Sequence, residues 1–481
     1  MIEIQDGKRI YGILLISSIV SMVLSIIATA VVLMADSNMP EQYKYLYLLP
    51  LGHIVLSIIP LARRVEGSLT IATLVFYWLY TLRNAFTPLL LPLCNFDSIM
   101  TAFGSKQCLN GIFLMLYETL IVYIGCSIIT PNYHKVRKLD EESEGVIETN
   151  PSKHSIYGFV VLIVFLFFLF GYIRLPQLRD TYYAIWDSSS YFAGERISRD
   201  LEGVFSGARL DRNIYVICKY IQKYLIFVIS IWVIDKLYAQ YDKNGNYLWL
   251  FLTLLIIPAQ FVFMSDANLA SFIAAFCLLY TILRVYPERK KSIYTFFFAT
   301  AFAAVILLSV NRFMNVSVSN YSRHKLSAFM QSYIPGVSNF ACLYNIKSDE
   351  MPSMFQTLLY DFISGLPFKG TFIGSTDYKL SLYYNSYSGA RGQILPCVGQ
   401  FAYYVTEILA PFLCLIYLKI AQTSLAMAEK ASTALEIMAY ILLFAYSVIN
   451  PATNNTTNYI SLVVQRVLPL FILRYFRRIR I

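Results

Sequence analysis

Arginine is concentrated in two long polar stretches of this chain. The stretch 174–213 contains six Arg and no Lys: Arg174, Arg179, Arg196, Arg199, Arg209 and Arg212. The stretch 312–395 begins at Arg312 and contains the basic run Arg323, His324 and Lys325. Both stretches end in Ser-Gly-Ala-Arg, at 206–209 and at 388–391. Because a guanidinium presents a planar fork of donors that matches phosphate oxygens, the pattern predicts a surface for a phosphorylated substrate.

His324 is the candidate general base of these stretches, because an imidazole changes protonation near neutral pH. The alternative is a solvated loop histidine without a chemical role. Acidic residues of the second stretch are scattered, and no DxD-like pair, P-loop or nucleophile elbow is present. The eight cysteines show no metal-binding spacing. We therefore expect neither a metal nor another cofactor. The sequence is compatible with disulfides between Cys94 and Cys108 or between Cys342 and Cys397. It is equally compatible with free thiols at these positions.

The composition indicates an integral membrane protein that must hold these residues at its surface. The chain has 481 residues, of which 57% are hydrophobic and only 14% charged, and its mean hydropathy is +0.56. Soluble domains contain about 25% charged residues. The net charge of +10 comes largely from short loops between apolar segments, so it does not indicate nucleic-acid binding.

Twelve apolar segments are long enough to cross a bilayer, which needs about 20 residues per helix. They lie at 10–34, 43–62, 68–93, 109–130, 156–173, 214–235, 247–264, 268–286, 292–311, 395–418, 433–450 and 459–475. Seven loops and termini on one side carry 20 Lys and Arg, and the four short loops opposite carry two. Both termini are therefore predicted to be cytoplasmic. The expected fold is an all-α polytopic membrane protein, a single integral membrane domain over 1–481, with about 12 transmembrane helices and two long extracytoplasmic loops at 174–213 and 312–395.

Four of these segments contain an ionisable residue near mid-depth: Arg83, Glu118, Glu407 and Arg466. Such residues are costly in a membrane and usually face a cavity or a partner. One interpretation is two structural ion pairs that fix helix packing, for example Arg83 with Glu118. The other is that Arg83 or Arg466 reaches a substrate diphosphate at the outer mouth, where Pro88 and Pro92 disturb the end of the third helix.

Two shorter patterns concern the membrane surface. Lys219 and Lys223 lie four residues apart on one helical face, which favours snorkelling to the interface, with contact to lipid phosphate as the alternative. The segment 351–363 places Met351, Phe355, Leu358, Leu359 and Phe362 on one face of a helix. This pattern predicts a helix that lies in the membrane surface.

The topology resembles that of bacterial O-antigen and capsule repeat-unit polymerases of the Wzy type. In the first long loop, Arg196 precedes Gly207 by the arginine–glycine spacing described for such loops; in the second, only Lys325 and Gly336 show it, and Arg323 does not. The segment Gly389–Pro396, followed by Gly399 and Tyr403, is similar to the stretch that often follows the last long loop.

The resemblance implies a metal-independent glycosyltransferase of the bacterial inner membrane that polymerises undecaprenyl-diphosphate-linked oligosaccharides. It implies a flippase and a chain-length regulator as partners, besides the lipid bilayer and the lipid-linked glycan, and no nucleic acid. Under this hypothesis His324, Arg323 and Arg196 are catalytic candidates. The substrate-binding candidates are Arg83, Arg199, Arg209, Arg212, Arg312, Lys325 and Arg391.

Three other classes compete with a polymerase. A lipid-linked oligosaccharide flippase or other twelve-helix transporter is the main one, although such carriers usually have short outer loops and internal pseudo-symmetry. An O-antigen ligase is the second, although Ser332 stands where the His motif expected of ligases has Gly. A polyprenol-phosphate-sugar transferase is the third; its acidic first outer loop is not matched by the separated Asp36 and Glu41.

Overall fold

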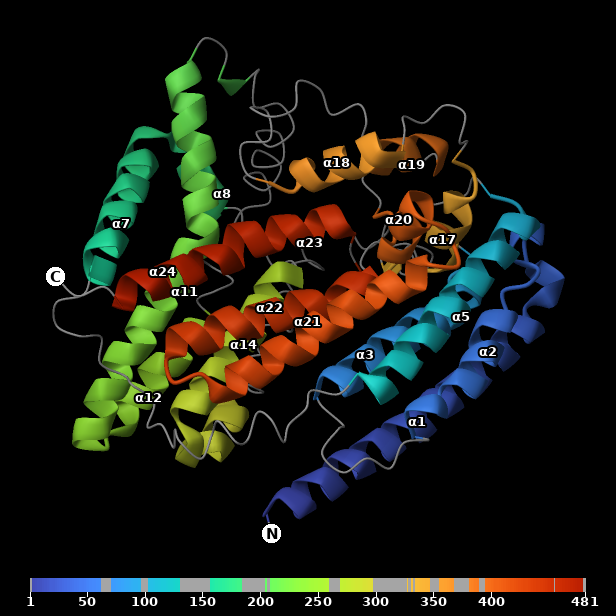
Figure 1. Ribbon diagram of the computed structural model, residues 1–481, viewed down its shortest axis with the longest axis horizontal. Helices are drawn as coiled ribbons and strands as arrows, with labels where there is room; N and C mark the ends of the chain where they lie inside the picture. The colour runs from blue at the N-terminus through green and yellow to red at the C-terminus, as the bar shows by residue number, and fades with distance from the viewer. Residues whose placement is uncertain are drawn as a thin grey trace. The chain divides into compact units, whose positions relative to one another are not determined.

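The computed structural model describes residues 2–61, 71–96, 103–129, 156–183, 204–205, 208–258, 269–296, 327, 330–331, 334–346, 354–366, 380–388, 394–453 and 455–478 (Figure 1). All regular secondary structure in these residues is helical. Six helices among them are long and apolar enough to cross a membrane: Gly12–Met34, Ser105–Ile128, Arg209–Asn244, Ala410–Lys430, Ala434–Thr453 and Thr456–Tyr475. The predicted all-α polytopic membrane class is confirmed at this level.

The chain divides into two compact units. Unit 1 contains residues Met1–Glu141, Val318–Ala426 and Tyr446–Leu462, and unit 2 contains Glu142–Ser317, Met427–Ala445 and Val463–Ile481. The stretch 312–395, predicted as a long loop, therefore contributes most of its length to unit 1. The stretch 174–213 belongs to unit 2.

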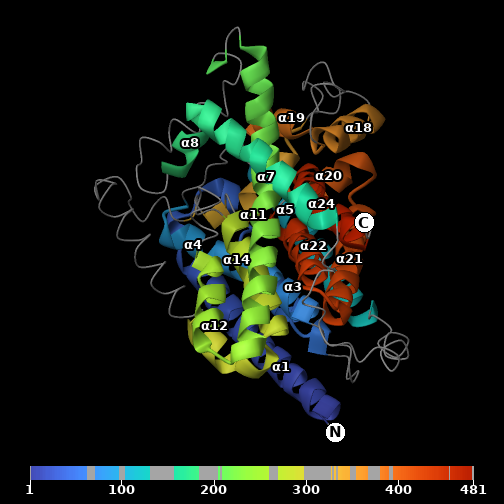
Figure 2. The same cartoon turned by 90° about the vertical axis from the view of Figure 1, so that its left-hand side faces the viewer.

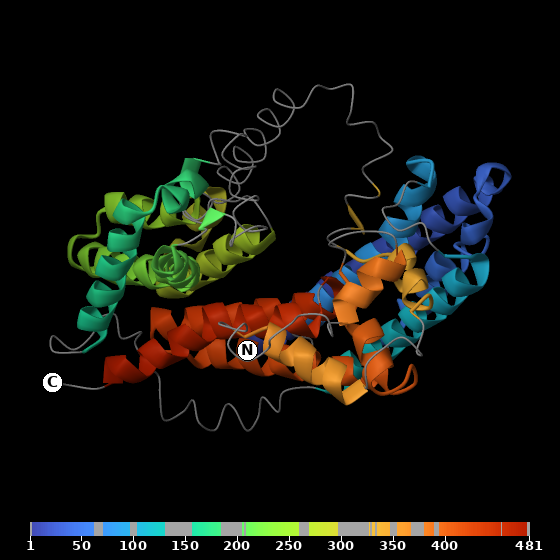
Figure 3. The ribbon, with the colours of Figure 1, turned by 90° about the horizontal axis from the view of Figure 1, so that it is seen from above.

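Unit 1 is built on a bundle of N-terminal helices that lie side by side in Figures 1 and 3. Its first part consists of α1 (Ile2–Met34), η1 (Asp36–Asn38), η2 (Glu41–Tyr43), α2 (Leu48–Leu56), η3 (Ile59–Leu61), α3 (Ile71–Thr81), η4 (Leu82–Phe86), α4 (Thr87–Leu93) and α5 (Ser105–Ile128). Its later part consists of α17 (Val337–Leu343), α18 (Met354–Ser364), α19 (Leu380–Ser388), α20 (Cys397–Tyr404), α23 (Thr456–Leu462) and parts of α21 (Ala410–Lys430) and α22 (Ala434–Thr453).

The short helix α17 packs directly on α5 at Gly111. A Cβ atom added at Gly111 would lie 3.0 Å from the backbone N of Ala341 and 3.1 Å from the backbone C of Phe340. Phe340, Ala341 and Cys342 are fully buried. The glycine therefore permits an approach of two helix backbones that a side chain would separate.

We expect Gly111→Ala to destabilise the protein by about 1–3 kcal/mol. The added methyl group would meet backbone atoms of α17, and these atoms would have to shift to make room for it. Gly158→Ala on α7 (Ile156–Arg174) is the matched control, because nothing lies within 4 Å of its Cβ position. The apparent melting temperature in detergent measures both. Equal melting temperatures for the two variants would contradict the close packing of α17 on α5.

Unit 2 is organised around α11 (Arg209–Asn244). The other helices that the structure describes in this unit are α7, α8 (Pro176–Tyr183), α12 (Tyr247–Leu254), α14 (Leu269–Val285), η5 (Pro287–Arg289), η9 (Val463–Val467) and α24 (Leu468–Arg478), with the remaining parts of α21 and α22. Figures 1 and 2 show α7 beside α11. The two helices meet at Gly171, where an added Cβ would lie 2.3 Å from Sγ of Cys218. Leu175, Leu178 and Ile214 belong to the buried cluster at this contact.

Large apolar side chains are exposed along the helices that lack neighbours on one side. On α1, Ile16, Ile19, Val23 and Ile26 are 50–63% exposed, and α7 exposes Phe159, Leu162 and Leu166. A soluble protein rarely exposes such continuous apolar faces. In a membrane protein these faces contact lipid chains.

The predicted tenth crossing, 395–418, is wrong as a single helix. The chain forms α20, leaves the helical conformation over 405–409, and begins α21 at Ala410. The helix of this region that is long and apolar enough to cross a membrane is Ala410–Lys430. Glu407, predicted at mid-depth in a helix, lies in the exposed break. All eight cysteines are free and buried, so neither open disulfide pairing forms.

Candidate functional site

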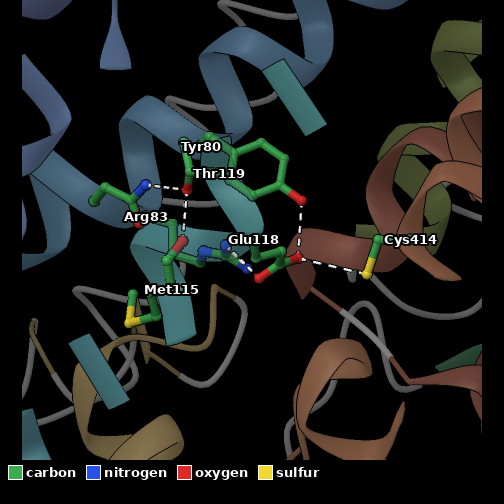
Figure 4. A network of polar contacts seen from close by, with 7 residues as sticks. Tyr80, Arg83, Met115, Glu118, Thr119 and Cys414 are labelled. Carbon is green, nitrogen blue, oxygen red and sulfur yellow. Dashed lines mark hydrogen bonds and ion pairs between the residues drawn. The ribbon is translucent and has the colours of Figure 1, made fainter. Parts of the chain in front are cut away.

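An ion pair between Arg83 of η4 and Glu118 of α5 is fully enclosed in unit 1. Nη2 of Arg83 donates to Oε2 of Glu118 at 2.7 Å, and both side chains are 0% exposed (Figure 4). The Tyr80 hydroxyl donates to Oε1 of Glu118 at 2.8 Å, and the Cys414 thiol lies 3.8 Å from the same oxygen. The pair named in the structural interpretation of the sequence is therefore present.

The guanidinium of Arg83 lies between two aromatic rings. Its Cζ is 4.5 Å from the ring centroid of Tyr80 and 5.2 Å from that of Phe340 on α17. Nε and Nη1 make no hydrogen bond to any residue in the described ranges. Aromatic faces compensate a cation partly, and a buried donor without an acceptor is costly. The substrate-binding role of Arg83 stays a prediction; in this conformation the guanidinium is closed off from the surface.

Two π-helical segments, η4 and η9, contain the buried arginines Arg83 and Arg466. Each ends two residues before a proline, Pro88 and Pro469 respectively. A proline has no N–H to donate to the carbonyl four residues earlier, and its ring clashes with that carbonyl. A π turn widens the backbone there and keeps the helix continuous. The prolines thus account for both segments, and each segment places an arginine inside its unit.

A histidine that sequence reasoning did not single out forms the second polar network of unit 1. Nδ1 of His53 on α2 is 3.1 Å from Oγ of Ser25 on α1, and its Nε2 is 3.2 Å from the Tyr123 hydroxyl on α5. The His53 side chain is fully buried. The sequence could have indicated this residue, because an ionisable side chain inside the apolar segment 43–62 needs a polar partner.

Four cations follow one face of α11 in unit 2. At 100° per residue, Arg209, Arg212, Lys219 and Lys223 fall within an arc of about 80°, and at 1.5 Å per residue they extend over about 21 Å. Arg209 is exposed, whereas Arg212, Lys219 and Lys223 are partly buried. We call these four residues the cationic face of α11. It runs from the N-terminal end of the helix toward the interior of the unit.

The inner end of the cationic face meets η9. Nζ of Lys223 donates to Oε1 of Gln465 at 2.6 Å, next to the buried Arg466. The Lys223 side chain therefore contacts η9, and its snorkelling to the membrane interface stays a prediction. Neither Lys219 nor Lys223 forms an ion pair with a described carboxylate. At the outer end, Asp211 is engaged by Nε of Arg174 at 2.8 Å. Lys219 and Lys223 therefore present positive charge suited to an anion.

Polar contacts also fix the segment around the break after α20. Oδ2 of Asp361 accepts from Nε2 of Gln400 at 2.8 Å and from the Tyr404 hydroxyl. Oε1 of Gln400 accepts from the backbone N of Thr456 at 2.8 Å. Beyond α17, burial raises the pKa of Tyr344, and the neighbouring Glu407, to which it is hydrogen-bonded, raises that pKa further.

Only part of the predicted site is covered by the described residues. Arg83 lies in unit 1, and Arg209 and Arg212 lie together on the first turn of α11 in unit 2. The other predicted site residues lie outside the described residues: Arg196, Arg199, Arg312, Arg323, His324, Lys325 and Arg391. Their catalytic and binding roles stay predictions.

The described residues define a class of protein rather than a family. They contain no group of three or more His, Cys, Asp or Glu side chains arranged to hold a metal ion. The class is a polytopic α-helical membrane protein with a buried ion pair in one unit and a cationic helix face in the other. No family model, curated protein sequence or solved structure matches the chain.

Proposed function

We propose that this chain is a membrane glycosyltransferase that polymerises undecaprenyl-diphosphate-linked oligosaccharide repeat units into O-antigen or capsular polysaccharide. The proposal includes twelve crossings of the bacterial inner membrane, both termini in the cytoplasm, and the stretches 174–213 and 312–395 on the outer side. A flippase supplies the lipid-linked unit, and a separate regulator sets chain length. The chemistry requires neither metal nor nucleotide, because the diphosphate is itself an activated leaving group.

The observation that carries the proposal is the cationic face of α11. A lipid-linked diphosphate has its charge at the membrane surface and its chain in the bilayer, so its site needs cations at that boundary. Arg209 and Arg212 open the helix, and Lys219 and Lys223 continue the same face into a predicted crossing. Fixed cations stabilise the charge that develops on a leaving diphosphate. The Arg-rich stretch before α11 adds further candidates, including Arg196 and Arg199.

A lipid-linked oligosaccharide flippase is the second candidate function. The helix break at 405–409 and the π-helical segments η4 and η9 favour it, because transporters often bind substrate at discontinuous helices. A cationic helix face serves the same diphosphate in either protein. The long stretch 312–395 favours the enzyme, because the outer loops of carriers are usually short.

The length of the surface glycan in a host lacking the gene separates these functions. For a polymerase, the mutant surface carries single repeat units, and the wild-type gene restores a ladder on a gel. Loss of all repeat units from the surface, with lipid-linked single units accumulating inside, would identify a flippase instead. Long polymer still attached to its lipid carrier would identify a ligase.

A further inference from the structure

The helix α18 has one face that no other described part of unit 1 covers. Phe355 is 71% exposed, Leu358 41%, Leu359 44% and Phe362 51%. At 100° per residue these four positions fall within an arc of about 100°. Asp361 is the only charged residue of α18, and it is buried on the other side. The exposed face is therefore apolar and uncharged; we call these four residues the apolar face of α18.

The opposite side of α18 is anchored, so the direction of the apolar face is fixed. Thr357 and Asp361 are buried, and the Asp361 carboxylate accepts from Gln400 and Tyr404 of α20. Just beyond the helix, a Cβ atom added at Gly365 would lie 2.8 Å from the carbonyl O of Thr457 on α23. Two contacts on different helices hold α18 against rotation about its axis. Turning the apolar face inward would break the hydrogen bonds of a buried carboxylate, which is costly.

The surroundings of α18 indicate what covers the apolar face. Its 11 residues extend about 16 Å, roughly half the thickness of a bilayer core, so it does not cross. Within unit 1 it lies at the end opposite the chain's N-terminus (Figures 1 and 2). It packs on α20, and the residues that follow α20 expose Val405, Ile408 and Leu409. The membrane-crossing α21 continues this apolar surface with Phe412 and Ile416.

We infer that α18 docks in the membrane surface, with its apolar face in the boundary between lipid headgroups and acyl chains. A short helix with an uncharged apolar arc, next to the lipid-facing surface of a crossing helix, fits this boundary. The Asp361 contacts then set the depth and tilt of α18, and through Gln400 they connect it to the break that precedes α21. This inference is independent of the proposed function.

Fluorescent labelling at single introduced cysteines tests the position of α18. All eight native cysteines are buried, so Phe355→Cys and, separately, Leu359→Cys can each be labelled selectively with a polarity-sensitive dye in the full-length protein. Ile19→Cys on the exposed face of α1 serves as the lipid control, and Lys243→Cys at the end of α11 serves as the aqueous control. The proteins are reconstituted into phosphatidylcholine vesicles with and without spin-labelled lipid.

We expect quenching at positions 355 and 359 to exceed that at 243 by about threefold and to be strongest with a spin label near the headgroup, whereas Ile19→Cys responds to deeper labels. Both replaced side chains are exposed, so the substitutions remove no internal packing. Quenching no greater than at 243 would overturn the inference. Oxidative cross-linking of two copies of the Phe355→Cys variant, without quenching, would also overturn it and assign the apolar face to a second copy.

Discussion

Replacing Glu118 by Gln is expected to lower the apparent melting temperature more than any other single neutralisation in the described part of the chain. The substitution preserves the shape of the side chain and leaves the fully buried Arg83 without its counter-charge. Removing one partner of a buried ion pair costs about 3–5 kcal/mol, because the remaining charge stays desolvated. The Tyr80 hydroxyl also loses a charged acceptor. Thermal unfolding of the purified protein in detergent measures the effect.

Two companion variants make this result specific. Asp211→Asn neutralises the exposed pair with Arg174, in which the Arg174 side chain is 43% exposed and that of Asp211 31%, and it should cost less than about 1 kcal/mol. The double variant Arg83→Met with Glu118→Leu should recover most of the stability lost in Glu118→Gln, because apolar residues often replace a buried pair without loss. If the Glu118→Gln protein has the same melting temperature as the wild type, the ion pair is refuted.

The double variant Lys219→Gln with Lys223→Gln is expected to abolish long polymer while leaving the amount of folded protein unchanged. Under the proposed function each lysine interacts with the lipid diphosphate. A hydrogen bond to a charged group contributes about 1.5–3 kcal/mol, so each loss reduces binding about tenfold or more. Both lysines lack an ion-pair partner among the described carboxylates, so their neutralisation leaves no buried acid behind. The glycan ladder of a complemented deletion host measures polymer length.

Two controls separate the diphosphate site from general effects of charge. Lys243→Gln removes a lysine from the exposed C-terminal end of the same helix and should leave the ladder intact. Lys219→Arg retains the charge and should keep polymer. If the double variant gives a normal ladder at an equal protein level, the cationic face of α11 has no part in the mechanism. The gene deletion tests the proposed function separately, and its result would still stand.

The sequence predicted those features that depend on local pattern. Apolar length and composition indicated membrane helices, and the spacing of Phe355, Leu358 and Phe362 indicated the helix α18. The cost of burying charge indicated that Arg83 needs a partner, and Glu118 was the example named. Each of these inferences uses a property of one segment or of one pair of charges.

Features that depend on long-range packing were not predictable in this way. The apolar run 395–418 resembles one helix by composition, and its break at 405–409 coincides with contacts of Gln400 and Tyr404 to a distant carboxylate, Asp361. The burial of α17 required the close approach of two backbones at Gly111, which composition does not reveal. The partner of Lys223 is Gln465, 242 positions further along the chain, so no local pattern connects the two.

Each π-helical segment accommodates one extra residue within an otherwise continuous helix. A π turn contains one more residue than the α turn it replaces, so everything after it is rotated by about 100° relative to an uninterrupted helix. Deleting one residue from 82–86 would let the rest wind as a regular turn that joins α3 and α4 in nearly their present orientation. Each of these two short segments should therefore tolerate the loss of one residue better than the gain of one, because an added residue would turn the following helix by about 100°.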